Sequence, residues 1–379
     1  MEKYTQFRDK GMQRHSPPAG MPDEGALRYE KADAYSHTGT AIAPFLPVPT
    51  TPTSLLWAPI HLTLFIIRAP AVLFLSIFYF GFLEFLPVGS LVKRCVLWAV
   101  LAVPGVWWVD LQVDGVKRGK LAEKQDHLPH AGTVIASSFT SPLDPLYLAG
   151  IFTPVFTRSW PGERRVEVVS LFRAIALAFS QPQLEPPRSA NLVTLKELTE
   201  KYPTSIVCVF PECTTTNGRG IMPFSPSLLT ADPKTKIYPV NLRYTPGDIT
   251  TPVPGGAHNW MWKLLSKPTH CMRVRIARHM YNNRSLDTPH AKDVPKASGV
   301  DMGFDTNIWD SPHMRNGVKH DGGDGDSEDE DGQKGISGEE QKVLDRVGED
   351  LARLGRVKRV GLGVDTKIDF VRVWASRKR

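Results

Sequence analysis

The sequence predicts an α/β fold: a mixed sheet flanked by helices, with an N-terminal hydrophobic helical hairpin. Three observations support this prediction. Short apolar runs rich in β-branched residues alternate with helical runs between about residues 110 and 280, as in α/β domains. Two apolar blocks precede this region. A polar loop, residues 210–220, follows one of the predicted strands, at the kind of position where ligands bind in such sheets.

The composition limits the class of protein and its partners. A chain of 379 residues can form one large domain or two small ones. Its net charge of +7, from 46 basic and 39 acidic residues, fits a nucleic acid or an anionic membrane surface. The apolar blocks favour the membrane, and without a zinc-finger or RNA-recognition pattern no nucleic-acid partner is expected. The four cysteines form no CxxC pair, which indicates a reducing, cytosol-facing location.

The N-terminal part divides into a polar arm and an apolar region. Residues 1–53 are rich in Pro and Gly and predict a disordered arm, whereas residues 54–110 predict a membrane-associated helical hairpin. The first apolar block, residues 55–86, can span a bilayer if its charged side chains reach an interface. The second block, residues 95–109, is shorter than the roughly 20 residues of a spanning helix and contains Pro104. The alternative is a buried helical pair in a soluble core.

The catalytic α/β domain is predicted to cover residues 111–299. Its strands and helices follow from the apolar periodicity and from β-branched enrichment. Strands are expected at residues 106–115, 133–136, 166–170, 205–210, 236–243 and 272–277, and helices at residues 145–151 and 190–201.

Beyond this domain the chain becomes acidic and then basic. The glycine-rich acidic run of residues 321–331 belongs to a low-complexity segment, residues 300–340, which predicts a disordered acidic insert. The run lacks the glycine and the flanking helices of a calcium loop, so no metal site is expected. Residues 341–379 are predicted to return to the domain as a helix and a strand with a basic end that could favour anionic lipid.

The loop at residues 210–220 carries groups suited to holding a ligand. It turns at Pro211 after a predicted buried strand and then presents a carboxylate, hydroxyls, an amide, a glycine and a guanidinium. Together these groups can hold a phosphate and a neighbouring hydroxyl. The alternative is an ordinary polar loop. The side chains and backbone concerned are those of Glu212, Thr214, Thr215, Asn217, Gly218 and Arg219.

A second polar turn follows the strand predicted at residues 133–136. It carries Ser141 and Asp144 directly before an apolar helix start. A carboxylate at this position can cap the helix amides or orient a catalytic partner. Both roles remain open for Asp144.

These segments resemble the motifs of PlsC-like glycerolipid acyltransferases, which move a fatty acyl group from acyl-CoA to a hydroxyl of a lysophospholipid. Family members carry N-H-x-x-x-x-D, then F-P-E-G-T, then a proline-containing strand. Here the three blocks are residues 138–144, 210–214 and 237–241, in the family's order and spacing, within residues 95–280. The Thr-Asn-Gly-Arg-Gly of residues 216–220 is similar to the fungal branch of lysophosphatidic acid acyltransferases linked to vacuolar protein sorting.

The resemblance implies a membrane-bound, acyl-CoA-dependent O-acyltransferase for a lysophospholipid such as lysophosphatidic acid, of the 1-acylglycerol-3-phosphate type. Acyl-CoA would be a co-substrate, and neither a cofactor nor a metal is expected. Membrane lipid would be a further partner. The location would be the endoplasmic reticulum or lipid droplets, with the catalytic domain facing the cytosol.

The resemblance also implies roles for the matching residues. Asp144 and Glu212 would be catalytic, with Asp144 orienting the reacting region. The residues expected to bind substrate are Ser141, Thr214, Thr215, Asn217, Gly218, Arg219 and Pro239.

Two positions depart from the family pattern. The family's histidine, which removes the proton from the acceptor hydroxyl, is replaced by Phe139, so the general base is unassigned. The family's glycine after the glutamate is replaced by Cys213, and a covalent route through this thiol would need a lowered pKa. His127 and His130, just before the strand, are the nearest histidines in sequence that could replace the base.

The loss of the histidine leaves two functions open. Positioning beside an activated thioester could sustain a slow transfer, because orientation alone is worth several kcal/mol. A missing base typically costs a factor of about 10²–10⁴ in rate. The alternative function is that of a catalytically degenerate protein of the same fold, acting in lipid binding or in vesicle and vacuolar trafficking.

Overall fold

The computed structural model describes residues 7–9, 42–50, 54–117, 119–121, 125–283 and 336–376. Most of the predicted arm, most of the predicted insert with its acidic run, and the last residues of the basic end lie outside the described residues.

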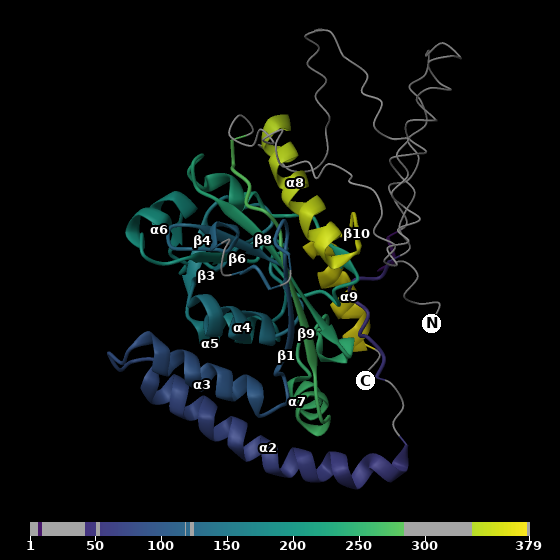
Figure 1. Ribbon diagram of the computed structural model, residues 1–379. Coiled ribbons are helices and arrows are strands. Elements are labelled where there is room, and N and C mark those ends of the chain that lie inside the picture. Colours follow the sequence, from purple (N-terminus) through teal and green to yellow (C-terminus); the bar gives the residue numbers. More distant parts are fainter. Residues whose placement is uncertain are drawn as a thin grey trace, which may run out of the picture.

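Within the described residues, eight strands form one mixed sheet flanked by helices, which confirms the predicted fold class (Figure 1). The strand order is β1-β9-β8-β2-β6-β3-β4-β5, and the central strands β8, β2, β6 and β3 are parallel. The carboxyl ends of these strands therefore meet at one edge, where ligands usually bind. The strands are β1 (Trp108–Val113), β2 (Val134–Ser137), β3 (Val155–Arg158), β4 (Val166–Val169), β5 (Leu192–Val193), β6 (Val207–Val209), β8 (Ile237–Thr245) and β9 (Cys271–Ile276).

Helices cover both faces of this sheet because successive strand residues point to opposite sides. Ile135 and Cys208 pack toward α3, α4 and α5, whereas their neighbours Val134 and Val207 pack toward α6 and α8. The helices are α2 (Ala58–Phe78), α3 (Ser90–Ala102), α4 (Leu143–Phe152), α5 (Leu171–Leu177), α6 (Leu195–Lys201), α7 (Ala257–Ser266), α8 (Gly338–Gly355) and α9 (Val364–Ser376).

The two apolar blocks form the helical pair α2 and α3, drawn below the sheet in Figure 1. A π-helical turn, Tyr79–Leu83, extends α2, so that Ala58–Leu83 is 26 residues long. Among the described residues, this is the one helix long and apolar enough to cross a membrane. Only 11% of its most apolar window is buried, so α2 itself is not a buried core helix, whereas Leu97 and Leu101 of α3 belong to the core.

The second helix is shorter than its apolar block. It ends at Ala102, and the chain then turns through Pro104 and Gly105. Gly105 has φ +87°, and a side chain there would lie 2.5 Å from the carbonyl oxygen of Pro268. Only glycine fits this close approach, so the rest of the block leaves the helix and enters β1, which begins at Trp108.

The helix predicted at residues 190–201 also begins later than expected. Leu192–Val193 form β5, and α6 starts at Leu195. The Thr194 hydroxyl accepts a hydrogen bond from the Glu197 amide at 3.2 Å, and the Glu197 carboxylate accepts one from the Thr194 amide. This capping box fixes the helix start five residues after the predicted one.

The C-terminal segment packs back on the sheet. α8 covers one face and buries Val347 and Leu351. The short strand β10 (Lys358–Arg359) then pairs in parallel with β7 (Gly220–Ile221), which follows the polar loop. Phe370 of α9 packs in a small core beside the loop. The C-terminal helices thus lie against the candidate site.

Candidate active site

The turn after β2 holds Asp144 at the start of α4, completely buried. Its Oδ2 accepts hydrogen bonds from the backbone amides of Thr140 and Ser141, at 2.6 and 2.9 Å. Its Oδ1 accepts a hydrogen bond from the hydroxyl of Tyr244, on β8, at 2.5 Å. Asp144 therefore closes its own turn and joins it to the neighbouring strand, which is a structural role; its catalytic role stays a prediction.

The same burial changes the protonation of Asp144. Desolvation raises the pKa of its carboxyl to about 6, although the hydrogen bonds from Tyr244, Thr140 and Ser141 oppose the rise. A carboxyl with a pKa near neutrality is typical of functional sites.

Phe139 occupies the histidine position of the motif and is 3% exposed. Its ring stacks on that of Phe210, with 4.5 Å between the centroids. Its carbonyl oxygen accepts a hydrogen bond from the Thr216 amide at 3.0 Å. The two motif segments therefore meet at this position through an apolar contact and a backbone bond.

The loop after β6 makes its turn at Cys213. This residue has φ +60°, a left-handed conformation that costs an L-residue about 1–2 kcal/mol and explains why glycine suits the position. Burial raises the pKa of the Cys213 thiol to about 12. The thiol therefore stays protonated at neutral pH, which disfavours the covalent route.

Glu212 is completely buried beside this turn. Its Oε2 accepts a hydrogen bond from the Met222 amide at 3.2 Å, whereas its Oε1 has no hydrogen-bond partner among the described residues. Burial raises the pKa of Glu212 to about 8. Asp144 adds to the rise, whereas the Met222 hydrogen bond and, less strongly, Lys367 oppose it. A buried, half-satisfied carboxyl is costly to folding, so it indicates a functional role.

Lys367 enters the same site from α9 and is 1% exposed. Its Nζ donates hydrogen bonds to the Thr214 hydroxyl at 2.7 Å and to the carbonyl oxygen of Thr215 at 2.5 Å. Burial lowers the pKa of Lys367 to about 7, and the Glu212 carboxyl opposes this change. The C-terminal helix thus supplies an amine able to exchange a proton near neutral pH.

Other predicted binding residues make bonds within the protein. Ser141 and Thr215 donate from their hydroxyls to carbonyl oxygens of the segment after β8, at 3.0 and 2.5 Å. Asn217 donates to two carbonyl oxygens of residues 42–50, at 2.7 and 2.9 Å. These bonds hold the loop in place, and substrate binding by these residues stays a prediction.

Three further residues lie differently around the loop. Gly218 has φ +69° and packs against Thr140. Arg219 is exposed and lines two cavities. Pro239 lies inside β8, opposite Ala136 of β2, and is buried.

A small opening reaches the motif residues. Its volume is about 20 Å³, room for one water-sized group, and Phe139, Cys213 and Thr214 line it. Arg158 lies at the same opening, with its guanidinium 4.9 Å from the Trp160 ring centre and bonded to Gln183 at 2.8 Å. The opening therefore combines a hydroxyl linked to Lys367 with a nearby cation.

A cleft of about 930 Å³ lies beside the loop, between residues 42–49, residues 250–256 and α7. Helix α7 packs on α2, with 5.0 Å between the ring centroids of Trp262 and Phe65. The cleft therefore lies close to the apolar helix.

Neither histidine considered as a replacement base lies near Asp144. His127 and His130 precede β2, whereas Asp144 follows it, so they lie at opposite ends of this strand. The His127 ring bonds to the Asp114 carbonyl oxygen at 3.2 Å, and the His130 ring to that of Leu128. This placement excludes His127 and His130 as substitutes for the motif histidine.

The structure adds three residues that the motifs did not identify. Tyr244 carried a weak signal in the sequence, because it directly follows the strand predicted at residues 236–243, which contains the third motif block. Lys367 and Arg158 carried none, since they are ordinary basic residues of segments without a motif.

Comparisons with known proteins give one match. No family model and no solved structure matches the chain. The chain is 26% identical, over 233 residues, to a Schizosaccharomyces pombe protein named "Putative lysophosphatidic acid:oleoyl-CoA acyltransferase". The match covers 59% of this chain and 76% of that protein. It supports the likeness of the motifs to acyltransferases and carries no link to vacuolar protein sorting.

Proposed function

We propose that this chain is a membrane-bound, acyl-CoA-dependent O-acyltransferase that acylates a lysophospholipid such as lysophosphatidic acid. The observation that carries the proposal is the junction of the two motif segments, where Phe139 meets Phe210 beside the buried carboxyls of Asp144 and Glu212. The Schizosaccharomyces pombe relative, whose name gives lysophosphatidic acid and oleoyl-CoA, supports the same substrates.

The reaction needs an acceptor for one proton. The lysophospholipid oxygen would bond to the acyl carbon as its O–H bond breaks, and the C–S bond of the thioester would break to release CoA. Phe139 cannot take the proton, and a general base contributes a factor of about 10²–10⁴ in rate. Another group must therefore act in place of the motif histidine.

Thr214 and Lys367 would replace the histidine. The Thr214 hydroxyl lines the opening at Phe139 and bonds to the Lys367 amine. With Lys367 neutral, this hydroxyl can pass its own proton to Nζ while it accepts the proton of the lysophospholipid. A lysine with a pKa lowered to about 7 is suited to this transfer. The carboxylate form of Glu212, populated as the pH rises toward its pKa of about 8, would stabilise the ammonium formed, and Arg158 would hold a negatively charged substrate group.

The apolar helix would place the site at the bilayer. Large apolar side chains are exposed along α2, among them Ile67 at 66% and Phe74 at 69%. Such a surface marks a contact with membrane or protein. An acyl chain could pass from the bilayer to the cleft beside α7 without crossing water. The location at the endoplasmic reticulum or lipid droplets, with the catalytic domain in the cytosol, follows from the family resemblance.

Lipid binding without transfer is the second candidate. Its supporting observation is the enclosed, histidine-free motif, in which Phe139, Asp144 and Glu212 are all almost completely buried. In this function the cleft and α2 would bind lipid, and no acyl group would be transferred.

The deciding experiment measures transfer of labelled oleoyl groups from CoA to several lysophospholipids by the purified full-length protein. Glu212→Gln and Asp144→Asn should lower the rate by about 10²-fold or more. Glu163→Gln, which removes the partner of Arg165 outside the site, should not lower it. No transfer by the wild type to any lysolipid would leave lipid binding as the function. Full activity of Glu212→Gln would refute the site assignment.

A further inference from the structure

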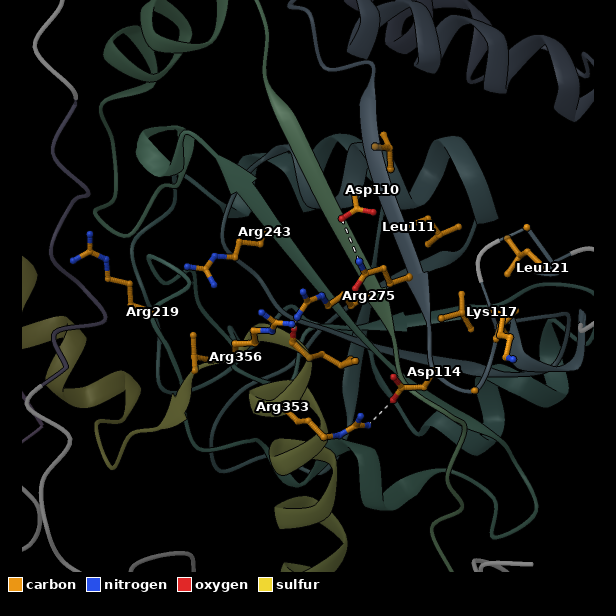
Figure 2. Close-up of a pocket in the computed structure, with 18 of the residues that line it drawn as sticks. Asp110, Leu111, Asp114, Lys117, Leu121, Arg219, Arg243, Arg275, Arg353 and Arg356 are labelled. Carbon is orange, nitrogen blue, oxygen red and sulfur yellow. Dashed lines mark hydrogen bonds and ion pairs between the residues drawn. The ribbon is translucent and has the colours of Figure 1, made fainter. Parts of the chain in front are cut away.

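A cavity of about 1430 Å³, drawn in Figure 2, shares Arg219 with the cleft. β1 forms one wall together with Arg275 of β9 and Arg243 of β8. The end of α8 and the residues that follow it, 354–358, form the opposite wall. The cavity is thus built from chain segments that precede residue 284 and segments that follow residue 335 in the sequence.

The strand pattern explains why this part of the sheet is charged. Arg275 of β9 lies opposite Gln112 of β1 and opposite Asn241 of β8 in the strand register. Arg243 follows Asn241 by two residues on β8, so its side chain points to the same face. Their chain neighbours Leu242 and Val274 point to the opposite face and belong to the core. The face toward α8 therefore carries polar side chains at this edge of the sheet.

Basic side chains outnumber the acidic ones around this cavity. Its two carboxylates are neutralised: Asp114 pairs with Arg353 at 2.6 Å, and Asp110 with Arg273 at 3.2 Å. The other basic side chains of the lining have no carboxylate partner among the described residues. They are Lys117, Arg219, Arg243, Arg275, Arg356 and Lys358.

Arg275 shows the unbalanced charge most clearly. Its Nη1 donates to the Leu354 carbonyl oxygen at 2.7 Å, but its buried Nε has no partner among the described residues. Burial lowers the pKa of Arg275, and the charges of Arg356, Arg273 and Arg243 lower it further, whereas Asp110 opposes the change. A bound anion would relieve this repulsion and satisfy the unused donor.

Capping of α8 accounts for only part of this arrangement. Arg243 and Arg275 each bond to one of the last carbonyl oxygens of the helix, through one N–H group. A guanidinium has five N–H donors, so most of them remain free. The helix end therefore positions both arginines without using their capacity to bind an anion.

Arg356 lies where glycine is the usual residue. It caps α8 with φ +50°, a left-handed conformation that is unfavourable for an arginine. Strain of this kind is concentrated at functional sites. Here it is accompanied by a side chain that lines the cavity.

We propose that this basic cavity binds the phosphate groups of a ligand. Guanidinium groups bind phosphate through paired hydrogen bonds, and the volume admits a nucleotide-sized molecule. The same chemistry is offered by the phosphates of CoA and by the head group of an anionic lipid. Arg219 connects the cavity with the cleft beside the motif loop, so CoA bound here would be the acyl donor. That last step rests on the proposed function, whereas phosphate binding does not.

The test measures binding by the full-length protein without any acyl transfer. One arm titrates free CoA, with CoA lacking its 3′-phosphate for comparison. The other arm compares phosphatidylcholine vesicles with and without phosphatidic acid, so that the contribution of α2 is subtracted. Arg356→Gly removes a charge and also relieves the left-handed strain, so its melting temperature should equal or exceed that of the wild type. Arg275→Gln is the second variant, and Arg372→Gln, an exposed arginine of α9 paired with Asp369, is the control.

At least one ligand should bind to the wild type and bind roughly tenfold more weakly to Arg356→Gly, with no change in Arg372→Gln. Weaker binding of CoA by Arg356→Gly identifies CoA as the source of the phosphates. Weaker binding of this variant to the vesicles that contain phosphatidic acid identifies the lipid head group. The proposal is overturned if the wild type binds neither ligand, or if Arg356→Gly and Arg275→Gln bind as tightly as the control. CoA binding without acyl transfer would refute the proposed function alone.

Discussion

At the scale of single residues, the site differs from the acyltransferase motifs at the position of their histidine. Phe139 fills the histidine position and stacks on Phe210, so the position contributes packing in place of a base. Nearby, Lys367 and Glu212 are buried, with pKa values shifted to about 7 and about 8. Both groups therefore change protonation close to neutral pH, which the missing histidine would otherwise do.

Under the proposed function, a histidine at the motif position should raise the rate of acyl transfer. Phe139→His introduces a base at the motif position, and we expect the transfer rate to rise by roughly 10-fold or more. The loss of the stacked ring should lower the free energy of unfolding by about 1–3 kcal/mol. Phe139→Leu, which loses the ring without gaining a base, serves as the control. Equal rates for the two variants would contradict the assignment of this position.

The buried charges should make stability depend on pH in an unusual way. Burial raises the pKa of Glu212 from 4.5 to about 8, so the folded state keeps a proton over that range and stability falls as the pH rises through it. Burial lowers the pKa of Lys367 from 10.5 to about 7, so the unfolded state binds the extra proton there and stability rises with pH. The two slopes oppose each other between about pH 7 and pH 8.

The free energy of unfolding should therefore fall between pH 6 and 7 and rise between pH 8 and 10, as measured by urea denaturation. The raised pKa of Asp144, about 6, affects mainly lower pH values. Glu212→Gln should remove the fall between pH 6 and 7, by about 1 kcal/mol. If the free energy of unfolding of the wild type is constant over both pH ranges, the pKa values of Glu212 and Lys367 are not shifted in the folded state.

At the scale of elements, α2 is the feature that separates this chain from an ordinary soluble α/β domain. It buries little of its apolar surface, and it is tied to the domain by Arg68, whose guanidinium donates to the Pro268 carbonyl oxygen at 3.0 Å. The helix thus presents its exposed apolar face from a fixed position on the domain.

Charged residues on this face should release the protein from membranes. Ile67→Glu combined with Phe74→Glu replaces two side chains that are 66% and 69% exposed, at a cost of about 2–3 kcal/mol each in a bilayer. Vesicle flotation should show the double variant in the soluble fraction. Leu184→Glu, at an apolar position 46% exposed and outside α2, should float like the wild type. Flotation of the double variant with the vesicles would contradict a membrane role for α2.

The sequence predicts most elements but not the parts that depend on distant contacts. The central strands β2, β6 and β8 carry β-branched runs and were located within a few residues, and the polar ends of β2 and β6 located the two motif turns. The fourth central strand, β3, was not predicted. The strand predicted at residues 106–115 already overlapped the second apolar block, but the close approach of Gly105 to Pro268, which ends α3, cannot be read from local periodicity. The role of Lys367 was missed because its partner Thr214 lies 153 residues earlier.

At the scale of the whole molecule, segments from both ends of the chain converge on the loop at residues 210–220. Residues 42–50 accept the hydrogen bonds of Asn217, α9 supplies Lys367, and β10 pairs with the strand after the loop. The motifs alone therefore do not make the site. Its electrostatics depend on the C-terminal segment, whose docking places an amine beside Glu212.

The most direct test of this account is the pH dependence of oleoyl transfer from CoA to lysophosphatidic acid, measured for the wild type and Lys367→Met. The wild-type rate should rise as the pH increases through about 7, because the neutral form of Lys367 accepts the proton. Lys367→Met, which keeps most of the side-chain volume, should be slower by about 10²-fold and should lack this rise. No transfer by the wild type at any pH, or an unchanged rate and profile in Lys367→Met, would contradict the account.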